Sequence, residues 1–151
     1  MDILKKIKSK DFSVGIVGLG YVGLPLAYAF SNMDIKTVGF DINSDQTKKL
    51  NNKTSYLKHI PDEKISDMIN KGFKATTNFK KIIDVDVIII CVPTPLNHHK
   101  EPDLSAVINT GNSIAPYMRK DHLIILESSS YPGTTDEQFA ESLKESNLIK
   151  N

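Results

Sequence analysis

The chain has 151 residues, of which 40% are hydrophobic and 25% charged, the composition of one soluble globular domain. Lys and Arg (19) nearly cancel Asp and Glu (18), so no net charge recruits nucleic acid or an anionic membrane surface. Apolar runs fall far short of the roughly 20 residues that cross a bilayer, the N-terminus does not resemble a secretory signal, and the single cysteine allows no internal disulfide, so we expect a cytoplasmic protein.

The first predicted element is a short amphipathic helix at residues 3–10, where Ile and Leu alternate with lysines. We assign residues 1–13 to a leader that packs one face of this helix on the domain, and residues 14–151 to the domain itself. The lysines of the leader lack interleaved aromatic residues, so they indicate a solvated helix face rather than a nucleic-acid platform.

The next segment has the pattern of a strand, a tight turn and a helix. The run VGIV (14–17) predicts a buried strand, and apolar residues recur at helical spacing from Val22 onwards. Pro25 fits the first turn of this helix, where its missing N–H has no partner to lose. A second strand is predicted at 35–41, and a helix at 43–52 follows it with Asn or Ser as the N-cap.

The rest of the chain continues to alternate helices and strands. Its predicted elements are a helix at 61–72, strands at 73–78 and 85–92, a helix from Leu104 to Ala115 capped by Asp103 and ended by Pro116, a strand at 122–128 and a helix at 134–146. Strict alternation selects a parallel sheet with right-handed crossovers and helices on both faces. We therefore predict one α/β domain, a Rossmann-type doubly wound sheet with strand order 3-2-1-4-5.

A glycine-rich loop joins the first strand to the first helix of the domain. Gly18, Gly20 and Gly23 form a G-x-G-x-x-G pattern in this context, which is typical of dinucleotide-binding sites. Gly18 would allow the tight turn, Gly20 a close approach of the backbone to a pyrophosphate, and Gly23 close packing of helix and strand. The unpaired N–H groups and the positive helix end would meet the diphosphate. The alternative is a purely structural turn.

An acidic residue closes the second strand, 18 positions after Gly23. The Asp41 carboxylate at this position would accept hydrogen bonds from a ribose 2′-hydroxyl and repel a 2′-phosphate, which favours NAD over NADP. The alternative is that Asp41 only caps the turn or helix that follows it.

Two later loops leave the C-terminal ends of strands, where open α/β sheets bind ligands. Two prolines hold the loop VPTP (92–95) extended, so Thr94 can present a hydroxyl or backbone group to a cofactor. The loop ESSSYPGTT (127–135) offers a cluster of hydroxyls near the expected nicotinamide position. Either loop could instead be a routine turn.

Three other residues suggest chemistry that the pattern does not support. Cys91 ends an apolar strand without a nearby His, so we interpret it as a small core residue rather than a nucleophile. His98 and His99 are adjacent in a loop, but no set of Cys and His residues completes a zinc site, so we expect no metal.

The motifs GLGYVGLP (18–25), CVPTPL (91–96) and ESSSYPGTT (127–135) carry a family resemblance. In order and spacing they resemble the N-terminal NAD-binding domain of the UDP-glucose/GDP-mannose dehydrogenase family, from Ser13 to the end of the chain. The Tyr-Pro-Gly of the third motif is similar to the branch that oxidises UDP-N-acetylhexosamines, namely UDP-N-acetylglucosamine and UDP-N-acetylmannosamine.

The resemblance implies an NAD-dependent oxidoreductase of polysaccharide precursor synthesis. Such an enzyme oxidises the C6 alcohol of a UDP-sugar to a carboxylate, giving a uronate. The cofactor-binding residues that it implies are Gly18, Leu19, Gly20, Tyr21, Val22, Gly23, Asp41, Val92, Pro93, Thr94, Ser128, Ser129 and Ser130. For Ser129 it also implies a catalytic part in handling active-site water and protons.

In this family the cysteine nucleophile and its lysine, asparagine and acidic partners lie beyond the segment present here, in central and C-terminal regions. We therefore expect residues 1–151 to bind NAD without turnover and to be monomeric or weakly associated, and the parent enzyme to be a homo-oligomer that takes a UDP-sugar.

Two other interpretations stay open. Another Rossmann dehydrogenase, of the 3-hydroxyacyl-CoA or 6-phosphogluconate type, would share the glycine loop but not ESSSYPGTT. A stand-alone NAD-sensing or regulatory module would bind the dinucleotide and catalyse nothing.

Overall fold

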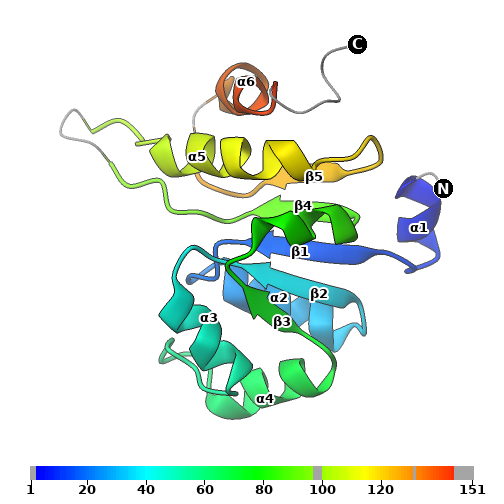
Figure 1. Cartoon of the computed structure of the whole chain (residues 1–151). Helices are drawn as coiled ribbons and strands as arrows, with labels where there is room; N and C mark the ends of the chain where they lie inside the picture. Colours follow the sequence, from blue (N-terminus) through cyan, green and yellow to red (C-terminus); the bar gives the residue numbers. More distant parts are fainter. Residues whose placement is uncertain (1–2, 97–99, 131, 145–151) are drawn as a thin grey trace.

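A computed structural model describes residues 3–96, 100–130 and 132–144. His98, His99, Tyr131 and the last residues of the helix predicted at 134–146 lie outside the described residues. The strands of the sheet are β1 (Ser13–Val17), β2 (Lys36–Phe40), β3 (Lys74–Thr76), β4 (Val87–Ile90) and β5 (Leu123–Leu126). All neighbours pair in parallel, in the order β3-β2-β1-β4-β5 (Figure 1). This confirms the predicted doubly wound sheet and its strand order.

The direction of winding reverses between β1 and β4. From β1 the chain winds outward through β2 to β3, and then crosses to the other side of β1 to form β4 and β5. The ladders extend past the strands at this edge, because the N–H of Gly18 donates to the Phe40 carbonyl (2.8 Å) and the N–H of Cys91 to the Val17 carbonyl (2.7 Å). The carboxyl ends of β1, β2 and β4 are therefore level, which is where an open α/β sheet forms its ligand crevice.

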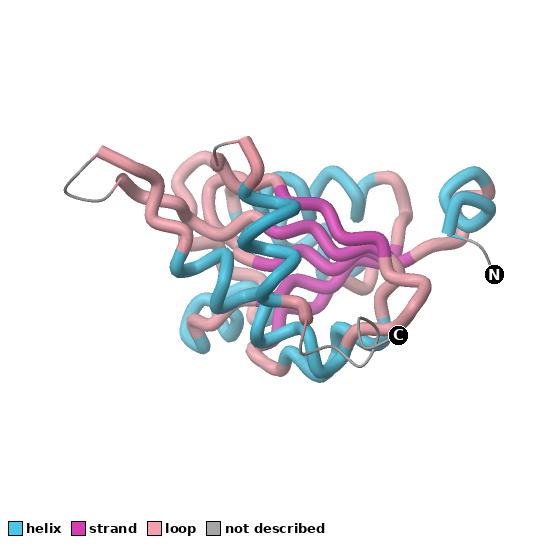
Figure 2. The backbone as a smooth tube through the Cα atoms, turned by 90° about the horizontal axis from the view of Figure 1, so that it is seen from above, coloured by secondary structure: helices cyan, strands magenta, loops and turns pink. Residues whose placement is uncertain are grey.

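Helices cover both faces of the sheet, and Figure 2 shows the strands side by side between them. One face is covered by α2 (Gly23–Asn32), α3 (Ser44–Asn51) and α4 (Asp62–Asn70). The other face carries the 3₁₀ helix η1 (Phe79–Asp84), α5 (Ser105–Ile114) and η2 (Ala115–Tyr117), with η3 (Thr134–Phe139) and α6 (Ala140–Ser142) packed against α5. Pro25 lies in the first turn of α2 and Pro116 lies just past the end of α5, as predicted.

Both faces of β4 are buried, which explains its continuous Val and Ile. Val87 and Ile89 belong to the core on the α2 and α4 side, whereas Ile88 and Ile90 belong to the core on the α5 side. Side chains alternate between the two faces along a strand, so one apolar run supplies both cores.

The helix η1 has no counterpart among the predicted elements. The side chain of Asn78 caps the N-terminus of this helix, where it accepts a hydrogen bond from the N–H of Lys80. Phe79, Ile82 and Val85 all belong to the core on the α5 side and follow at intervals of three residues. A 3₁₀ helix has three residues per turn, so this spacing is its signature rather than that of an α-helix.

The last helix also differs from the prediction. A regular helix was expected from residue 134, but η3 is a π-helix and only the short α6 after it is α-helical. Thr134 and Phe139, which are five residues apart, are both buried. The hydrogen bonds of a π-helix join residues five apart, whereas those of an α-helix join residues four apart, so the first part of this segment is wound more widely than predicted.

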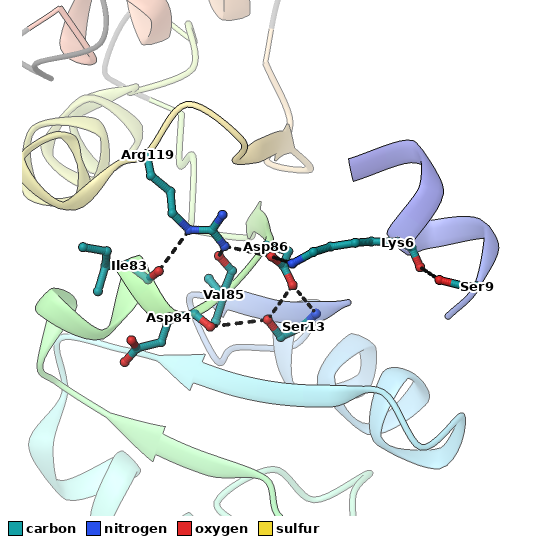
Figure 3. Close-up of polar contacts among 8 residues, drawn as sticks. All are labelled: Lys6, Ser9, Ser13, Ile83, Asp84, Val85, Asp86 and Arg119. Carbon is teal, nitrogen blue, oxygen red and sulfur yellow. Dashed lines mark hydrogen bonds and ion pairs between the residues drawn. The ribbon is translucent and has the colours of Figure 1, made fainter. Parts of the chain in front are cut away.

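The N-terminal helix α1 (Ile3–Lys8) is tied to the edge of the sheet opposite the carboxyl ends (Figure 3). Lys6 and Arg119 both contact Asp86 Oδ1, at 2.6 and 2.8 Å, and the N–H and hydroxyl of Ser13 donate to its Oδ2. The expectation that all leader lysines are solvated is therefore wrong for Lys6, whose side chain is half-buried against Asp86.

Within the described ranges, no helix has the length and apolar character needed to cross a membrane.

Candidate functional site

Two adjoining hollows lie where β1, β2, β4 and β5 end. The larger one encloses about 610 Å³ and the smaller one about 390 Å³. They share the residues Gly18, Asp41, Ile42, Val92 and Pro93. They therefore form one crevice at the reversal of the strand order, the position expected for a ligand in this fold.

The three glycines of the loop each meet a different steric demand. Gly18 has a φ of 90°, and a Cβ there would stand 2.7 Å from the Cys91 carbonyl oxygen. A Cβ on Gly23 would stand 1.8 Å from the Gly18 carbonyl oxygen, so only glycine lets α2 pack this closely on the loop. A Cβ on Gly20 would meet no atom within 4 Å, which leaves the backbone open to a ligand. Gly18 thus serves the turn, Gly23 the packing of the helix and Gly20 the open approach, as predicted.

The glycine loop lines the larger hollow and has backbone donors without partners among the described residues. The carbonyls of Gly20 and Val22 accept the N–H groups of Leu24 and Leu26, so they point along the starting helix α2. No partner within the described residues accepts the N–H of Gly20, Tyr21 or Val22. Unpaired N–H groups together with the positive end of the helix dipole make a site for an anion.

Leu19 lies between two of these glycines and serves as the anchor of the loop. Its side chain is fully buried and packs over Gly39 in β2, where a Cβ would stand 2.8 Å from the Leu19 methyl groups and from the Phe73 ring. Its N–H donates to Asp41 Oδ2 at 2.9 Å. Of the predicted cofactor residues, Leu19 and Gly23 line neither hollow, and the structure gives both a packing role.

Asp41 lines both hollows and holds two backbone groups at the same time. Its Oδ2 accepts the N–H of Leu19, and its Oδ1 accepts the N–H of Asn43 at 2.9 Å. Asp41 therefore does cap the turn that follows it, as the alternative interpretation expected. Each carboxylate oxygen has a second acceptor site, so the side chain retains capacity for a diol in the crevice.

The two later loops both line the larger hollow and lie beside each other. Val92, Pro93 and Thr94 contribute to it after β4, and Ser128 and Ser129 contribute to it after β5. The Ser128 hydroxyl donates to the Val92 carbonyl at 2.7 Å and so ties the loops together. Ser130 is exposed and lines neither hollow.

Cys91 lines the larger hollow, which the sequence did not lead us to expect. The residue is half-buried just past the end of β4, and its Cβ would stand 3.2 Å from a Cβ placed on Gly23. Burial, with the charge of Glu127, raises the pKa of the Cys91 thiol to about 11. The thiol is therefore protonated at neutral pH, which argues against a nucleophile. Among the described residues, no group of His, Cys, Asp and Glu side chains is arranged to hold a metal ion.

Several residues of the crevice were missed from the sequence. In the larger hollow these are Ile42, Asn43, Gln46 and Glu127, and in the smaller one Val17, Phe79, Pro95, Asp103, Ser105, Ala106, Asn109, Thr110 and Ser113. Ile42 is 87% exposed in the structure, and its place directly after Asp41, the acidic residue that closes the second strand, is the sequence feature that could have marked it. The hydroxyl and amide groups of α5 recur every three or four residues, which could have marked a polar helix face.

The arrangement suits the two halves of a dinucleotide. The smaller hollow is lined by apolar residues, among them Ile42 and Pro93, and by hydroxyl and amide residues of α5, a mixture that suits a ring with hydrogen-bonding edges. The larger hollow combines anion-binding N–H groups, a carboxylate and a rim of hydroxyls. Tyr21 stands at this rim, 76% exposed and stacked on His59.

Residues 12–150 match the model of the UDP-glucose/GDP-mannose dehydrogenase family, NAD binding domain. The chain belongs to this family. It is 37% identical over 128 residues to a UDP-N-acetyl-D-glucosamine 6-dehydrogenase of Pseudomonas aeruginosa, covering 85% of this chain and 30% of that protein. It is 36% identical over 135 residues to a UDP-N-acetyl-D-mannosamine dehydrogenase of Yersinia pestis, covering 88% and 31%.

The solved structures agree with this assignment. A UDP-D-ManNAc dehydrogenase from Pyrococcus horikoshii superposes with a TM-score of 0.82 at 32% identity, covering 90% of this chain and 33% of that one. The chain thus spans about 30% of the length of the curated relatives it matches. Family and fold identify it as an NAD-binding domain of Rossmann type. This confirms the resemblance and the NAD cofactor expected from the sequence.

Proposed function

We propose that this domain is the cofactor module of a nucleotide-sugar 6-dehydrogenase, which oxidises the C6 alcohol of a UDP-N-acetylhexosamine to a uronate for polysaccharide precursors. One observation carries the proposal most directly. Gly20, Tyr21 and Val22, whose N–H groups have no partner among the described residues, line one hollow together with Asp41 at the reversal of the sheet. That is the donor and acceptor set that a diphosphate and an adjoining ribose require.

The proposed roles follow the chemistry of each group. Gly20, Tyr21 and Val22 hold the diphosphate through backbone N–H groups, and Asp41 accepts the hydroxyls of the adenosine ribose. The smaller hollow takes the adenine ring. Bound NAD would supply the hydride acceptor, and Thr94 and Ser129, which line the larger hollow, would lie near that end of the cofactor.

The sugar is proposed from two lines of support. Both curated relatives described above are named for UDP-N-acetylhexosamines. The ESSSYPGTT segment is similar to the same branch. Ser129 remains the candidate for handling a proton or water near the sugar, because it lines the larger hollow just after β5.

Cofactor binding is tested by calorimetric titration of this chain with NAD and with NADP. We expect NAD to bind at least ~10-fold more tightly, because Asp41 repels a 2′-phosphate and accepts a 2′-hydroxyl. Equal affinities would contradict the role given to Asp41.

The same chain should form no NADH when NAD is mixed with UDP-N-acetylglucosamine or UDP-N-acetylmannosamine. The crevice gives one wall of a reaction site, and holding the sugar in place supplies much of the barrier reduction. A Cys91→Ser variant is the control, because it removes the Cys91 thiol, which is protonated and half-buried in the unchanged chain. NADH formation that this variant abolishes would overturn the proposal.

A further inference from the structure

Both backbone groups of Leu19 are held by side chains from elsewhere in the chain. The N–H donates to Asp41, and the carbonyl accepts the hydroxyl of Tyr56 at 2.5 Å across 37 residues of sequence. Tyr56 lies between α3 and α4 and packs half-buried against the same core that holds the Leu19 side chain. It lines neither hollow of the crevice.

The direction of the Leu19 carbonyl fixes the direction of the next N–H. The described residues contain no cis peptide bond, and in a trans peptide the carbonyl and the following N–H point to opposite sides. With the Leu19 carbonyl turned toward Tyr56, the Gly20 N–H points away from the core. Gly20 lines the larger hollow, so this N–H is offered to that side.

Nothing in Gly20 itself holds the peptide in this orientation. Glycine populates both signs of φ with similar ease, and no atom stands within 4 Å of the place where a Cβ would lie. If the Leu19–Gly20 peptide rotated, its carbonyl would face the hollow and its N–H would face the core. A carbonyl oxygen in that position repels an anion instead of binding it.

We propose that Tyr56 is a positioning residue of the cofactor site, whose hydroxyl holds the Leu19–Gly20 peptide so that the Gly20 N–H faces the diphosphate. The inference rests on the proposed function, since it takes the larger hollow as the diphosphate site. Burial, with the charge of Asp41, raises the pKa of Tyr56, so the phenol keeps the proton that it donates.

The test is a Tyr56→Phe variant, which removes only the hydroxyl. Calorimetry with ADP-ribose, which carries the diphosphate, should show binding weakened by about 10-fold, the loss expected for one hydrogen bond to a charged group. Adenosine, which lacks the diphosphate, should change by less than ~2-fold in an NMR titration. A purely structural role would lower the Tm and leave ADP-ribose binding by the folded variant unchanged.

Tyr28→Phe is the matched control. Tyr28 packs half-buried against the same core, and its ring lies 5.2 Å from the Lys64 ammonium. Loss of its hydroxyl should alter neither affinity. The inference is wrong if Tyr56→Phe binds ADP-ribose as tightly as the unchanged protein. It is also wrong if the variant's affinity for adenosine falls by the same factor as its affinity for ADP-ribose.

A measurement on the unchanged protein does not depend on the folding of the variant. In an amide NMR spectrum, ADP-ribose should move the Gly20 N–H signal and adenosine should leave it in place. An unmoved Gly20 signal at saturating ADP-ribose would overturn the inference. Failure of the unchanged protein to bind either NAD or ADP-ribose would instead refute the proposed function itself.

Discussion

Asp41 joins the ligand crevice to the backbone that shapes it, because one carboxylate serves the hollow, Leu19 and Asn43. Replacement by Ala should weaken NAD binding by about 1.5–3 kcal/mol through the lost charged hydrogen bond, and should narrow the preference over NADP. Asp41→Asn should also narrow it, because the amide carries no charge to repel a 2′-phosphate. Calorimetry with both cofactors measures the change, and exposed Asp45 in α3, replaced by Asn, controls for the general effect of charge. Variants that keep the full preference would exclude Asp41 as its source.

At this scale the sequence predicts residues whose role depends on local order, and misses those that act over a distance. Asp41 and the glycines follow from their spacing along one strand-turn-helix segment. Tyr56 does not, because its partner is a backbone carbonyl 37 residues away, and no side-chain pattern records such a contact. Cys91 was expected inside the core, but it is only partly buried against that core and lines the crevice, because β4 ends at Ile90.

Among the elements, the helices with unusual periods are those that the sequence failed to predict. A search for the α-helical spacing overlooks η1, with its period of three, and takes η3 for a regular helix. The strands were easier to predict from the sequence. A strand such as β4 is buried on both faces, so every residue in it is apolar.

The contact of α5 with α6 gives a prediction at the same scale. A Cβ on Gly111 would stand 1.8 Å from the Ser142 hydroxyl and 3.3 Å from the Phe139 ring. We expect Gly111→Ala to cost about 1–3 kcal/mol of stability in urea unfolding, because α6 must move off α5. Adding Ser142→Gly should recover part of the loss. A Gly111→Ala variant as stable as the original would show that α6 moves without cost.

For the whole molecule, the cluster around Asp86 fastens α1, β1, β4 and the segment before β5 at the edge away from the crevice (Figure 3). Burial opposes the charge of Asp86, but hydrogen bonds from Lys6, Arg119 and Ser13 outweigh it and hold the pKa of this carboxyl below its usual range. A lowered folded pKa stabilises the native state above the unfolded pKa of about 4, and this stabilisation is lost as the pH falls below it.

Asp86→Asn should therefore lower the free energy of unfolding by about 2–3 kcal/mol at neutral pH. The difference in this free energy between the variant and the unchanged protein should shrink as the pH falls below about 4. Urea unfolding at a series of pH values measures this gap. Asp84→Asn is the control, because Asp84 is exposed and only its backbone carbonyl joins the cluster, through Ser13. A gap that is constant down to acid pH would mean that the charge of Asp86 contributes nothing.

Gly39 in β2 packs against Leu19 of the glycine loop, and this contact limits which substitutions the sequence can accept during evolution. A larger residue at this position would meet the Leu19 methyl groups and the Phe73 ring, each 2.8 Å from its Cβ. Its bulk would lift Leu19, and the loop with it, although Gly39 itself lines neither hollow. Position 39 is therefore expected to coevolve with positions 19 and 73, so that a gain of volume at one is inherited with a loss at another. The residue at position 39 in β2 therefore limits how far the sequence of the glycine loop can diverge.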